Sequence, residues 1–553
     1  MEKIKKSIQT VLQELFNLDG NVDLSVPDEQ FGDVASNVAM QITKQVGSPP
    51  REIAEKIAEK LKELEFVTEA SVAGPGFLNI RLSDDFLLQS LQADNPKVLA
   101  GKKFLIEYSD PNPFKPLHAG HLYTTLVGDV LARLVENAGA ETVRLNFGGD
   151  VGMHVGKTMW AIVKHLGGED ITAVKSLPID SLASWMGDRY VEGNNAFDDE
   201  SIQAEIKQVN KRVYQLHADG DHDSDFAQIY WYLRNQSYEF FKKLYSDLQV
   251  VAFDRFIPES EVAELGARTV RKHVGDVFIE SDGAIIFDGE SRGLHTRVFI
   301  NKEGLPTYEA KDVGLSLTKW QDYHFDESII ITANEQAQYM QVVLMAIEQF
   351  APEPAQRTKH LTHGLVKLAG GVKMSSRKGN ILSAFDILQS ARDAGHASGQ
   401  ANAEEVVLSA VKYALLKNRL GGDVVYDPTE SVAMEGNSGP YLQYAHARAC
   451  SILSKAGVVS NELRITKLGA GERTLVRKLA QYSDTVAQAT SELAPHVICT
   501  YLYELAQEFN RFYEQNKVIG DAKEAERLVL VQLYAETLKS GLNLLGIHAP
   551  EQM

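Results

Sequence analysis

Apolar residues recur at helical spacing in the first part of the chain, over residues 1–16 and again over 51–64. That spacing places one apolar stripe on each segment, as in an amphipathic helix that lies on a core. Over residues 78–82 apolar and polar residues alternate instead, which is typical of a strand with one buried face. We therefore expect a small α/β domain over residues 1–98, with a linker at 92–97.

The next part of the chain combines strands with a helix. Residues 103–109 (KFLIEYS) form a short apolar run, a Pro-rich turn and a helical stretch follow, and residues 142–147 (TVRLNF) form a second apolar run. Strand, helix and strand in this order predict a βαβ unit and hence a parallel, doubly wound, Rossmann-type sheet. The pattern is interrupted from about 158 to 290 and returns at 297–334. We therefore expect an α/β domain over residues 99–404 that is split by an insertion.

From residue 405 onward the pattern is helical with almost no strand signal, which predicts an all-α bundle over residues 405–553. No apolar run approaches the roughly 18 residues that a membrane span requires. Residues 1–16 have helical periodicity and lack the continuous apolar core of a secretory signal. We therefore expect three domains and no membrane segment.

Composition narrows the possible environments and partners. With 44% apolar and 24% charged residues, the chain is typical of a globular protein. Its two cysteines, Cys450 and Cys499, have no metal-ligand spacing, so we expect a reducing, cytoplasmic compartment and no cysteine-based zinc site. The formal net charge is −19, which excludes a general polyanion binder. Binding to nucleic acid would require local basic patches.

The motif KPLHAGH (115–121) lies between the first strand of the α/β domain and its helix. His118 and His121 are three residues apart and share a face of the first helical turn, where unpaired N–H groups and the helix dipole favour an anion. Their imidazoles can donate hydrogen bonds to phosphate oxygens, and Gly120 leaves room for a flat ring against the backbone. Taken alone, the motif also fits two surface histidines at a helix start.

A second motif, GGVKMSSRKGN (370–380), carries three cations. Lys373, Arg377 and Lys378 are flanked by glycines and hydroxyl residues, and Met374 supplies an apolar anchor. A loop of this kind can close over a triphosphate and stabilise the leaving pyrophosphate. Taken alone, it also fits an exposed basic loop.

Together the two motifs resemble the HIGH and KMSK signatures of class I aminoacyl-tRNA synthetases, whose Rossmann fold is split by a connective insertion. Other segments resemble arginyl-tRNA synthetases, in that family's order along essentially the whole chain. They are QFGDVASNVAM (30–40), AGPGFLNIRL (73–82), IEYSDPNPFKPLHAGH (106–121), NFGGDVG (146–152), YEAKDVGL (308–315), EGNSGPYLQYAHARACSIL (435–453) and LNLLGIHAPEQM (542–553). The resemblance implies a ligase that activates L-arginine with ATP to arginyl-adenylate. The arginine is then transferred to the 2′-hydroxyl of the terminal adenosine of tRNA(Arg).

Arginine presents a planar guanidinium with five donors and no acceptor, so its pocket needs fixed carboxylates and other acceptors. The resemblance assigns the guanidinium to Tyr308 and Asp312, which are four residues apart and lie on one side of a helical turn. Glu107, at the end of the first strand, is a further carboxylate candidate, and Glu259 could form another acidic wall. The resemblance also assigns the amino and carboxylate groups of the substrate to Asp110, Asn112, His121 and Gln336.

The resemblance places ATP, accompanied by Mg²⁺, between the HAGH and KMSS segments, and no structural metal is expected. The expected ATP-binding residues are His118, Gly120, His121, Lys373, Met374, Ser375, Ser376 and Lys378. The expected catalytic residues are Lys115, His118, His121 and Lys373. Ser376 stands where KMSK has its second lysine, so either Lys115 or Lys378 supplies the missing cation. Positioning and electrostatics should dominate this chemistry.

The resemblance implies that tRNA binds at both ends of the chain and must be bound before arginine is activated. Phe77 and Asn79 are candidates in the N-terminal domain, which reads the tRNA elbow in this family. The candidates for anticodon bases in the helical domain are Tyr441, Tyr444, Tyr513 and Met553. For Tyr441 and Tyr444, packing in a helical core is an equally good interpretation. We expect the chain to act as a monomer.

Two other functions remain open at this point. One is a different HIGH-type adenylyl transferase, such as a nucleotidylyltransferase or a synthetase for another amino acid. The pair Tyr308 and Asp312 and the matched outer domains argue against it. The other is an RNA-binding relative without catalysis, which predicts a broken HAGH or KMSS element, and both are largely intact.

Overall fold

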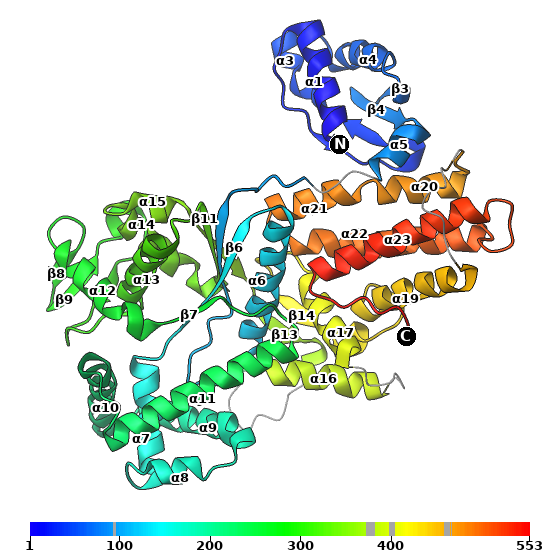
Figure 1. Ribbon diagram of the computed structural model, residues 1–553. Helices are drawn as coiled ribbons and strands as arrows, with labels where there is room; N and C mark the ends of the chain where they lie inside the picture. The colour runs from blue at the N-terminus through cyan, green and yellow to red at the C-terminus, as the bar shows by residue number, and fades with distance from the viewer. Residues whose placement is uncertain (92–95, 372–381, 398–403, 458–464, 466) are drawn as a thin grey trace.

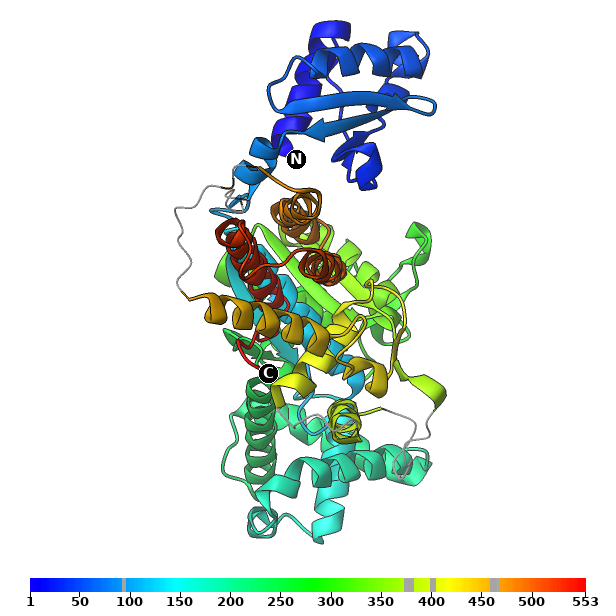
Figure 2. The ribbon, with the colours of Figure 1, turned by 90° about the vertical axis from the view of Figure 1, so that its right-hand side faces the viewer.

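The computed structural model describes residues 1–553 except 92–95, 372–381, 398–403, 458–464 and 466. Figure 1 shows a small N-terminal domain at one end, a central sheet with its flanking helices, and a group of long C-terminal helices. The view in Figure 2 shows the same order, with the N-terminal domain above the C-terminal helices.

The N-terminal domain is an antiparallel sheet of order β1-β2-β4-β3 on which helix α4 packs, with α1 packed against α4. Its elements are α1 (Glu2–Phe16), β1 (Leu24–Ser25), β2 (Val34–Ser36), α2 (Val38–Gln41), α3 (Thr43–Val46), α4 (Pro50–Leu61), β3 (Val67–Ala73), β4 (Phe77–Leu82) and α5 (Asp84–Ser90). Both expected helices and the alternating strand are present. In β4, Leu78 and Ile80 are buried against the helices, whereas Phe77, Asn79 and Arg81 lie on the opposite face.

The central sheet has five parallel strands in the order β12-β11-β5-β6-β7. Its strands are β5 (Lys103–Glu107), β6 (Glu141–Gly148), β7 (Arg255–Pro258), β11 (Glu327–Ala333) and β12 (Thr358–His363). This confirms the expected Rossmann-type sheet. Because all five strands run in one direction, their carboxyl ends meet at one edge, where ligands bind in open α/β sheets.

Helices cover the central sheet, and α6 connects it to the C-terminal helices. The helices of this region are α6 (Ala119–Asn137), α12 (Glu259–Lys272), α13 (Tyr308–Tyr323), α14 (Ala337–Glu348), α15 (Pro352–Gln356) and α16 (Ala384–Ala397). Helix α6 contacts β5 and β6 as well as α21, α22 and α23, and most of its residues are buried. It therefore belongs to the cores of both regions.

An all-helical insertion lies between β6 and β7. Its helices are α7 (Met153–Leu166), α8 (Ile171–Lys175), α9 (Ile179–Ala196), α10 (Glu200–Asp219) and α11 (Asp225–Asp247). The sequence pattern predicted that the interruption would extend to about 290, but β7 already pairs with β6 at Arg255–Pro258. Four residues, RFIP, are too few to give a recognisable strand pattern. The segment at Arg297–Ile300 is instead β10 of a separate antiparallel sheet, with β8 (Ile279–Ser281) and β9 (Ala284–Phe287).

The C-terminal region is the predicted all-α bundle. Its helices are α17 (Glu404–Leu416), α18 (Pro428–Ser431), α19 (Gly439–Ala456), α20 (Ala470–Leu479), α21 (Tyr482–Ser491), α22 (Pro495–Gln515) and α23 (Glu524–Leu544). A short parallel pair, β13 (Val366–Leu368) and β14 (Val424–Tyr426), joins it to the central region. Within the described chain, no helix is both long and apolar enough to cross a membrane.

The N-terminal domain is held on α20 by buried charges. Arg473 donates hydrogen bonds to both carboxylate oxygens of Asp33, at 3.0 and 2.8 Å, and its Nε donates to Asp84 at 3.0 Å. Asp33 is 4% exposed, and the Nε atom of Arg477 lies 3.3 Å from its Oδ1. Two-pronged guanidinium–carboxylate bonds are directional, so this contact fixes the orientation of the N-terminal domain on the bundle.

Candidate functional site

The segments that follow the five parallel strands gather at the carboxyl edge of the central sheet. A loop leads from β5 to α6, and the segment GGDVG follows β6. Glu259 follows β7 directly, the 3₁₀ turn Asn334–Gln336 follows β11, and His363 ends β12. The strand order therefore places Glu107, Glu259, Gln336 and the histidine helix α6 around one edge.

The loop after β5 has an unusual backbone that hydrogen bonds hold in place. Ser109 and Asp110 have φ values of 73° and 48°, in the left-handed region that non-glycine residues rarely adopt. Asp110 Oδ1 accepts a hydrogen bond from the Phe147 N–H at 2.8 Å, and Asn112 Oδ1 accepts one from the Gly149 N–H at 2.7 Å. These bonds orient the loop on the end of β6. They leave Asp110 with a second carboxylate oxygen and Asn112 with an amide donor for a ligand.

Four carboxylates and two lysines form a buried cluster next to this loop. Glu107 is 3% exposed and its Oε2 lies 2.8 Å from Lys319 Nζ, while Glu259, 4% exposed, pairs with Lys311. The other two carboxylates are Asp110 and Asp312. Neither forms an ion pair with any residue that the structure describes. The cluster therefore holds more acid than it has cations to balance.

Burial and the neighbouring carboxylates together raise the pKa values of the two unpaired acids. Burial, together with the charges of Glu107 and Glu259, raises the pKa of Asp312 to about 8, although the Tyr339 hydroxyl donates a hydrogen bond to this carboxylate. Burial and the neighbouring Glu107 also raise the pKa of Asp110 well above its usual range. A bound cation would restore the ionised form of both groups. The cluster therefore suits a positively charged ligand.

Tyr308 lies at the start of α13, one turn before Asp312, and its side chain is 51% exposed. Its ring has Lys311 Nζ 5.0 Å from the centroid, and its hydroxyl lies 3.3 Å from His154 Nδ1. Asp312 is held by Tyr339, which comes from α14. Lys311 contacts both the Tyr308 ring and Glu259, so the structure places the predicted pair, Tyr308 and Asp312, next to Glu259 at one side of the cluster.

Gly149 marks the point where three side chains meet. A Cβ at this position would lie 2.6 Å from Asn112 Oδ1, 3.1 Å from Glu259 Oε1 and 3.1 Å from His154 Cε1. Real Cβ atoms do not approach oxygen this closely, so a side chain here would push the three residues apart. Gly149 therefore contributes to the site in two ways. Its lack of a side chain leaves room for the three residues, and its backbone N–H donates to Asn112.

The two histidines of HAGH stack on each other at the start of α6, with ring centroids 3.7 Å apart and an interplanar angle of 24°. The His118 backbone N–H donates to His121 Nδ1 at 3.2 Å, so a neutral His121 carries its proton on Nε2. Burial lowers the pKa of His118 to about 4 and that of His121 well below its usual range. A Cβ at Gly120 would lie 2.9 Å from the His118 ring, which explains the glycine. Both rings are thus neutral hydrogen-bond donors near pH 7.

The second signature, including Lys373, Met374, Ser375, Ser376 and Lys378, lies outside the described residues, which resume at 382. The chain that follows it is paired with HAGH. The Ala119 N–H donates to the Leu382 carbonyl at 2.8 Å, and the Ala384 N–H donates to the Leu117 carbonyl at 3.3 Å. Two segments far apart in sequence are therefore neighbours at the start of α6.

Lys115 provides a cation close to this helix start. Its Nζ lies 5.5 Å from the centre of the Tyr190 ring, and it forms no ion pair with a described carboxylate. Its charge helps to lower the pKa values of His118 and His121. An anion placed at the start of α6 would therefore find both the charge of Lys115 and the positive end of the helix dipole.

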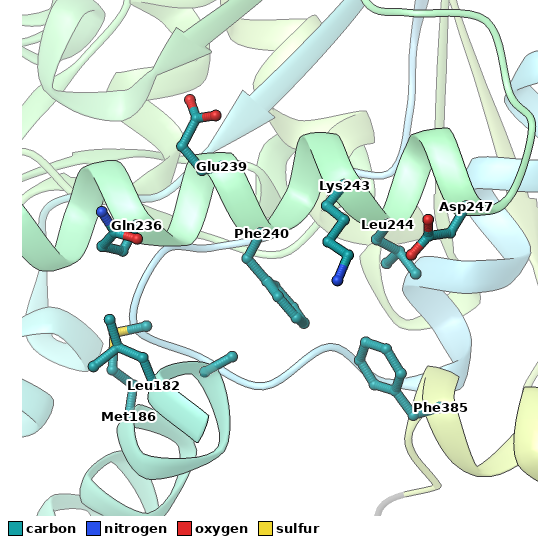
Figure 3. Close-up of a pocket in the computed structure, with 10 residues that line it drawn as sticks. Leu182, Met186, Gln236, Glu239, Phe240, Lys243, Leu244, Asp247 and Phe385 are labelled. Atoms are coloured by element: carbon teal, nitrogen blue, oxygen red, sulfur yellow. The ribbon is translucent and has the colours of Figure 1, made fainter. Parts of the chain in front are cut away.

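An apolar hollow of about 320 Å³ lies on the insertion side of Lys115. Figure 3 shows Phe240 of α11 and Phe385 of α16 among its lining residues, with Lys243 of α11 extending toward the two rings. The two rings are 5.6 Å apart. A second hollow of about 310 Å³ extends it to Lys115. Neither hollow is lined by a residue of the acidic cluster, so the carboxylates of that cluster lie outside both hollows.

The sequence-predicted RNA contacts differ in exposure. Phe77 is 44% exposed, while Asn79 is nearly buried and lines a shallow hollow of about 160 Å³ together with Phe31 and Arg81. Phe31 is also exposed and was not predicted from the sequence.

In the C-terminal bundle, Tyr444 and Met553 are exposed. Tyr441 packs against Tyr503 with ring centroids 5.9 Å apart and accepts a hydrogen bond from Asn510. Tyr513 stacks with Phe509 and with Arg448. Tyr444 and Met553 are therefore accessible on the surface of the bundle, whereas Tyr441 is partly enclosed by its neighbours.

Several site residues were not predicted from the sequence, although two of them, Asp150 and Lys311, lie within the quoted segments NFGGDVG and YEAKDVGL. These residues are Asp150, His154, Lys311, Lys319, Tyr339 and His363. The fully buried Asp150 accepts hydrogen bonds from Arg234 of the insertion at 2.8 Å and from the backbone and hydroxyl of Ser260 at 2.9 and 2.7 Å. It therefore ties α11 to the start of α12, next to Glu259. In the part of the chain that the structure describes, no three His, Cys, Asp or Glu side chains are placed to hold a metal ion.

Comparison with known proteins gives matches along almost the entire chain. The family described as "Arginyl tRNA synthetase N terminal domain" matches residues 2–82, "tRNA synthetases class I (R), catalytic domain" matches 84–427, and "DALR anticodon binding domain" matches 442–553. An arginine–tRNA ligase of Lactobacillus delbrueckii subsp. bulgaricus is 30% identical over 576 aligned positions, which cover 100% of this chain and 99% of that protein.

Two solved structures have the same overall fold. The arginyl-tRNA synthetase of Thermus thermophilus superposes with a TM-score of 0.82 at 26% identity, over 100% of both chains. That of Plasmodium falciparum also gives 0.82, at 21% identity, over 100% of this chain and 99% of the other. All three regions described above are therefore present, in the same order, in solved proteins.

Proposed function

Because the chain belongs to the class I arginyl-tRNA synthetases, we propose a role for each site residue in arginine charging. The protein is an arginine–tRNA ligase, which activates L-arginine with ATP and attaches the arginine to tRNA(Arg). The observation that carries our assignment is the buried cluster with two unpaired carboxylates at the carboxyl edge of the sheet, beside the stacked histidines.

The guanidinium of arginine lies against Asp312 and the Tyr308 hydroxyl, with Glu259 as the next acidic wall. Five donors in a rigid fork match these acceptors, and the positive charge balances the surplus acid. Glu107 contributes mainly through its charge, because one of its oxygens is held by Lys319. A lysine substrate would supply one point charge without the fork, so it would leave acceptors unpaired.

The amino and carboxylate groups of arginine lie over the loop after β5. The second oxygen of Asp110 accepts from the ammonium, and the amide nitrogen of Asn112 donates to the carboxylate. His121 Nε2–H and Gln336 complete this part of the site. Held in this way, the substrate carboxylate points toward the start of α6.

ATP, as its magnesium complex, lies with its phosphates between the start of α6 and the second signature. His118, Gly120 and His121 line the first side, and Lys373, Met374, Ser375, Ser376 and Lys378 line the second. We assign the missing KMSK cation to Lys115, since its charge acts directly on the two histidines. The arginine carboxylate attacks the α-phosphate in line and pyrophosphate leaves, while Lys115, Lys373, His118 and His121 stabilise the charge on the phosphoryl oxygens.

In the second step the 2′-hydroxyl of the terminal adenosine of tRNA loses its proton and attacks the carbonyl carbon of the arginyl-adenylate, the bond from that carbon to the phosphate oxygen breaks, and AMP leaves. The N-terminal domain (residues 1–98) contacts the tRNA elbow through Phe77 and Asn79, and the helical domain (405–553) contacts the anticodon. The anticodon contacts are Tyr441, Tyr444 and Met553. The family matches at 2–82, 84–427 and 442–553 support three regions in this order, and we propose 99–404 as the bounds of the catalytic domain. We further propose that the chain acts as a monomer in the cytoplasm, where its two free cysteines remain reduced.

Charging of total tRNA with each of twenty labelled amino acids tests the substrate, and arginine alone should be incorporated. His118→Ala and Lys373→Ala test the ATP site, and each should lower the charging rate by about 10²-fold or more. Lys359→Ala, on the exposed side of β12, is the matched control because its ion pair lies at the surface. Wild-type rates in the first two variants would refute the assigned ATP site.

A further inference from the structure

His154 lies in the first turn of α7, between the segment GGDVG and the start of α13. Its two ring nitrogens have different partners. Nε2 lies 2.8 Å from the Gly149 carbonyl oxygen, and Nδ1 lies 3.3 Å from the Tyr308 hydroxyl. Because the ring contacts both groups, the position of its proton decides which partner donates in each of the two hydrogen bonds.

The carbonyl of Gly149 can only accept a hydrogen bond, so Nε2 of His154 carries a proton. Burial lowers the pKa of His154 to about 4, and the nearby Lys311 also disfavours a charged ring. The imidazole is therefore neutral, and Nδ1 has only a lone pair to offer. The Tyr308 hydroxyl must donate its hydrogen to Nδ1. A tyrosine hydroxyl has an ordinary pKa of about 10, so it retains that hydrogen at pH 8.5 and below.

We propose that His154 is a specificity-determining positioning residue, which orients the Tyr308 hydroxyl so that it presents only acceptor lone pairs to the substrate side chain. This inference rests on the proposed arginine site, in which Tyr308 faces the guanidinium. With its hydrogen directed to His154, the Tyr308 oxygen can accept a guanidinium N–H. It cannot turn to donate to another ligand without losing the bond to Nδ1.

The consequence is selection against the ureido analogue of arginine, citrulline. Citrulline has nearly the same shape, but it is neutral and places a carbonyl oxygen, an acceptor, where arginine has an N–H donor. Opposite Tyr308 and ionised Asp312, that oxygen meets only acceptors. Two acceptors that face each other with no hydrogen between them both stay unsatisfied. This lowers the binding affinity far more than the loss of one methylene contact does. Without His154, the Tyr308 hydroxyl can rotate and donate to the ureido oxygen.

The test compares kcat/KM for arginine with kcat/KM for citrulline in charging of tRNA(Arg), at pH 8.5, where Asp312 is ionised. The ratio of the two values does not depend on the fraction of correctly folded enzyme, so a partly unfolded variant still gives an answer. We expect His154→Ala to lower this ratio about tenfold or more. His154→Gln should restore most of the ratio, because one amide can donate to the Gly149 carbonyl and accept from Tyr308.

His165→Ala, at the exposed end of the same helix, is the matched control and should leave the ratio unchanged. An unchanged ratio in His154→Ala would overturn the inference. Tyr308→Phe separates this outcome from failure of the arginine site itself. If Tyr308→Phe leaves kcat/KM for arginine at the wild-type value, the proposed arginine site is wrong. If it lowers kcat/KM for arginine while His154→Ala keeps the wild-type ratio, only the role of His154 is wrong.

Discussion

Lys319 Nζ lies 2.8 Å from Glu107 Oε2, and both side chains are almost fully buried. The lysine comes from the end of α13, whose first turn carries Tyr308, and the glutamate ends the central strand β5. This ion pair therefore joins the helix that bears Tyr308 and Asp312, the proposed guanidinium-binding pair, to the middle of the sheet. It holds the pocket in shape, whereas Asp312 is left for the substrate.

Glu107→Gln should mainly reduce stability. It leaves the Lys319 ammonium buried without its counter-charge, and the loss of one member of a buried pair typically costs about 3–5 kcal/mol of unfolding free energy. Urea denaturation followed by circular dichroism measures this cost. Glu141→Gln removes an exposed partner of Lys103 and should cost less than about 1 kcal/mol. Equal losses in the two variants would contradict the structural role of the buried pair.

Asp312→Asn should mainly reduce activity, without a loss of stability at pH 8. It removes a charged acceptor of the guanidinium, so kcat/KM for arginine should fall by about 10²–10³-fold, while KM for ATP stays near the wild-type value. The folded chain raises the pKa of Asp312 to about 8, so its ionisation removes stability as the pH rises from the unfolded value toward 8. The variant should therefore melt at a higher temperature than the wild type at pH 8. A lower melting temperature there would contradict the charge surplus.

Arginine affinity should rise with pH. Below pH 8 the empty pocket holds a proton on Asp312, and this proton must leave before the carboxylate can accept from a guanidinium. KM for arginine should therefore fall by up to about tenfold per pH unit below the pKa and level off above it. Asp110 contributes in the same direction, because its pKa is also raised. Steady-state kinetics from pH 6 to 9 test this, and KM for ATP serves as the internal reference.

Gly120→Ala should impair ATP chemistry and spare arginine recognition. The added Cβ would lie 2.9 Å from the His118 ring and displace it from its stack with His121. We expect kcat to fall by about 10–100-fold, because a shift of the order of 1 Å in a catalytic group has this effect. Gly422→Ala is the control, since its Cβ would meet no atom within 4 Å. Normal turnover in Gly120→Ala would argue against a precise position for His118.

Arg473→Ala should weaken tRNA binding without changing the affinity for arginine. The substitution leaves Arg477 and the Leu82 N–H as the partners of the buried Asp33 and removes its two-pronged bond, so the N-terminal domain should be oriented less firmly on α20. If that domain contacts the tRNA elbow, KM for tRNA should rise about 5–20-fold. Arg511→Ala, which removes an exposed arginine of α22, is the matched control. The same KM for tRNA in both variants would show that the domain orientation is not needed for tRNA binding.

The architecture could be predicted from periodicity wherever the elements are long. The helix at 1–16, the strand at 78–82 and the C-terminal helices all lie where the apolar pattern indicates. Strand β7 was not visible, since Arg255–Pro258 gives no alternation to detect. The segment 297–300 was recognised as a strand, but the pattern of one strand does not identify its partners, and it belongs to a different sheet.

The site could be predicted only where its residues lie within recognisable motifs. His118 and His121 share a face of the first helical turn, as expected from their spacing, and Tyr308 and Asp312 share one side of α13; the stacking of the two imidazoles was not predicted. Lys311 sits between them in YEAKDVGL, but a lysine in a helical pattern usually faces solvent. Its burial depends on Glu259, which is 52 residues away in sequence. Partners of this kind become visible only in three dimensions.

The surplus of acid around Asp110 and Asp312 also affects the lifetime of the protein. A ligand that binds only the folded chain protects it from unfolding, and the protection increases with the concentration of that ligand. Arginine supplies the positive charges that this pocket lacks, so the loaded chain should resist heat and proteases better than the empty one. When the arginine supply of a cell runs low, the enzyme that consumes arginine would then unfold and be degraded more readily. Through this one pocket, protein turnover would then follow nutrient supply.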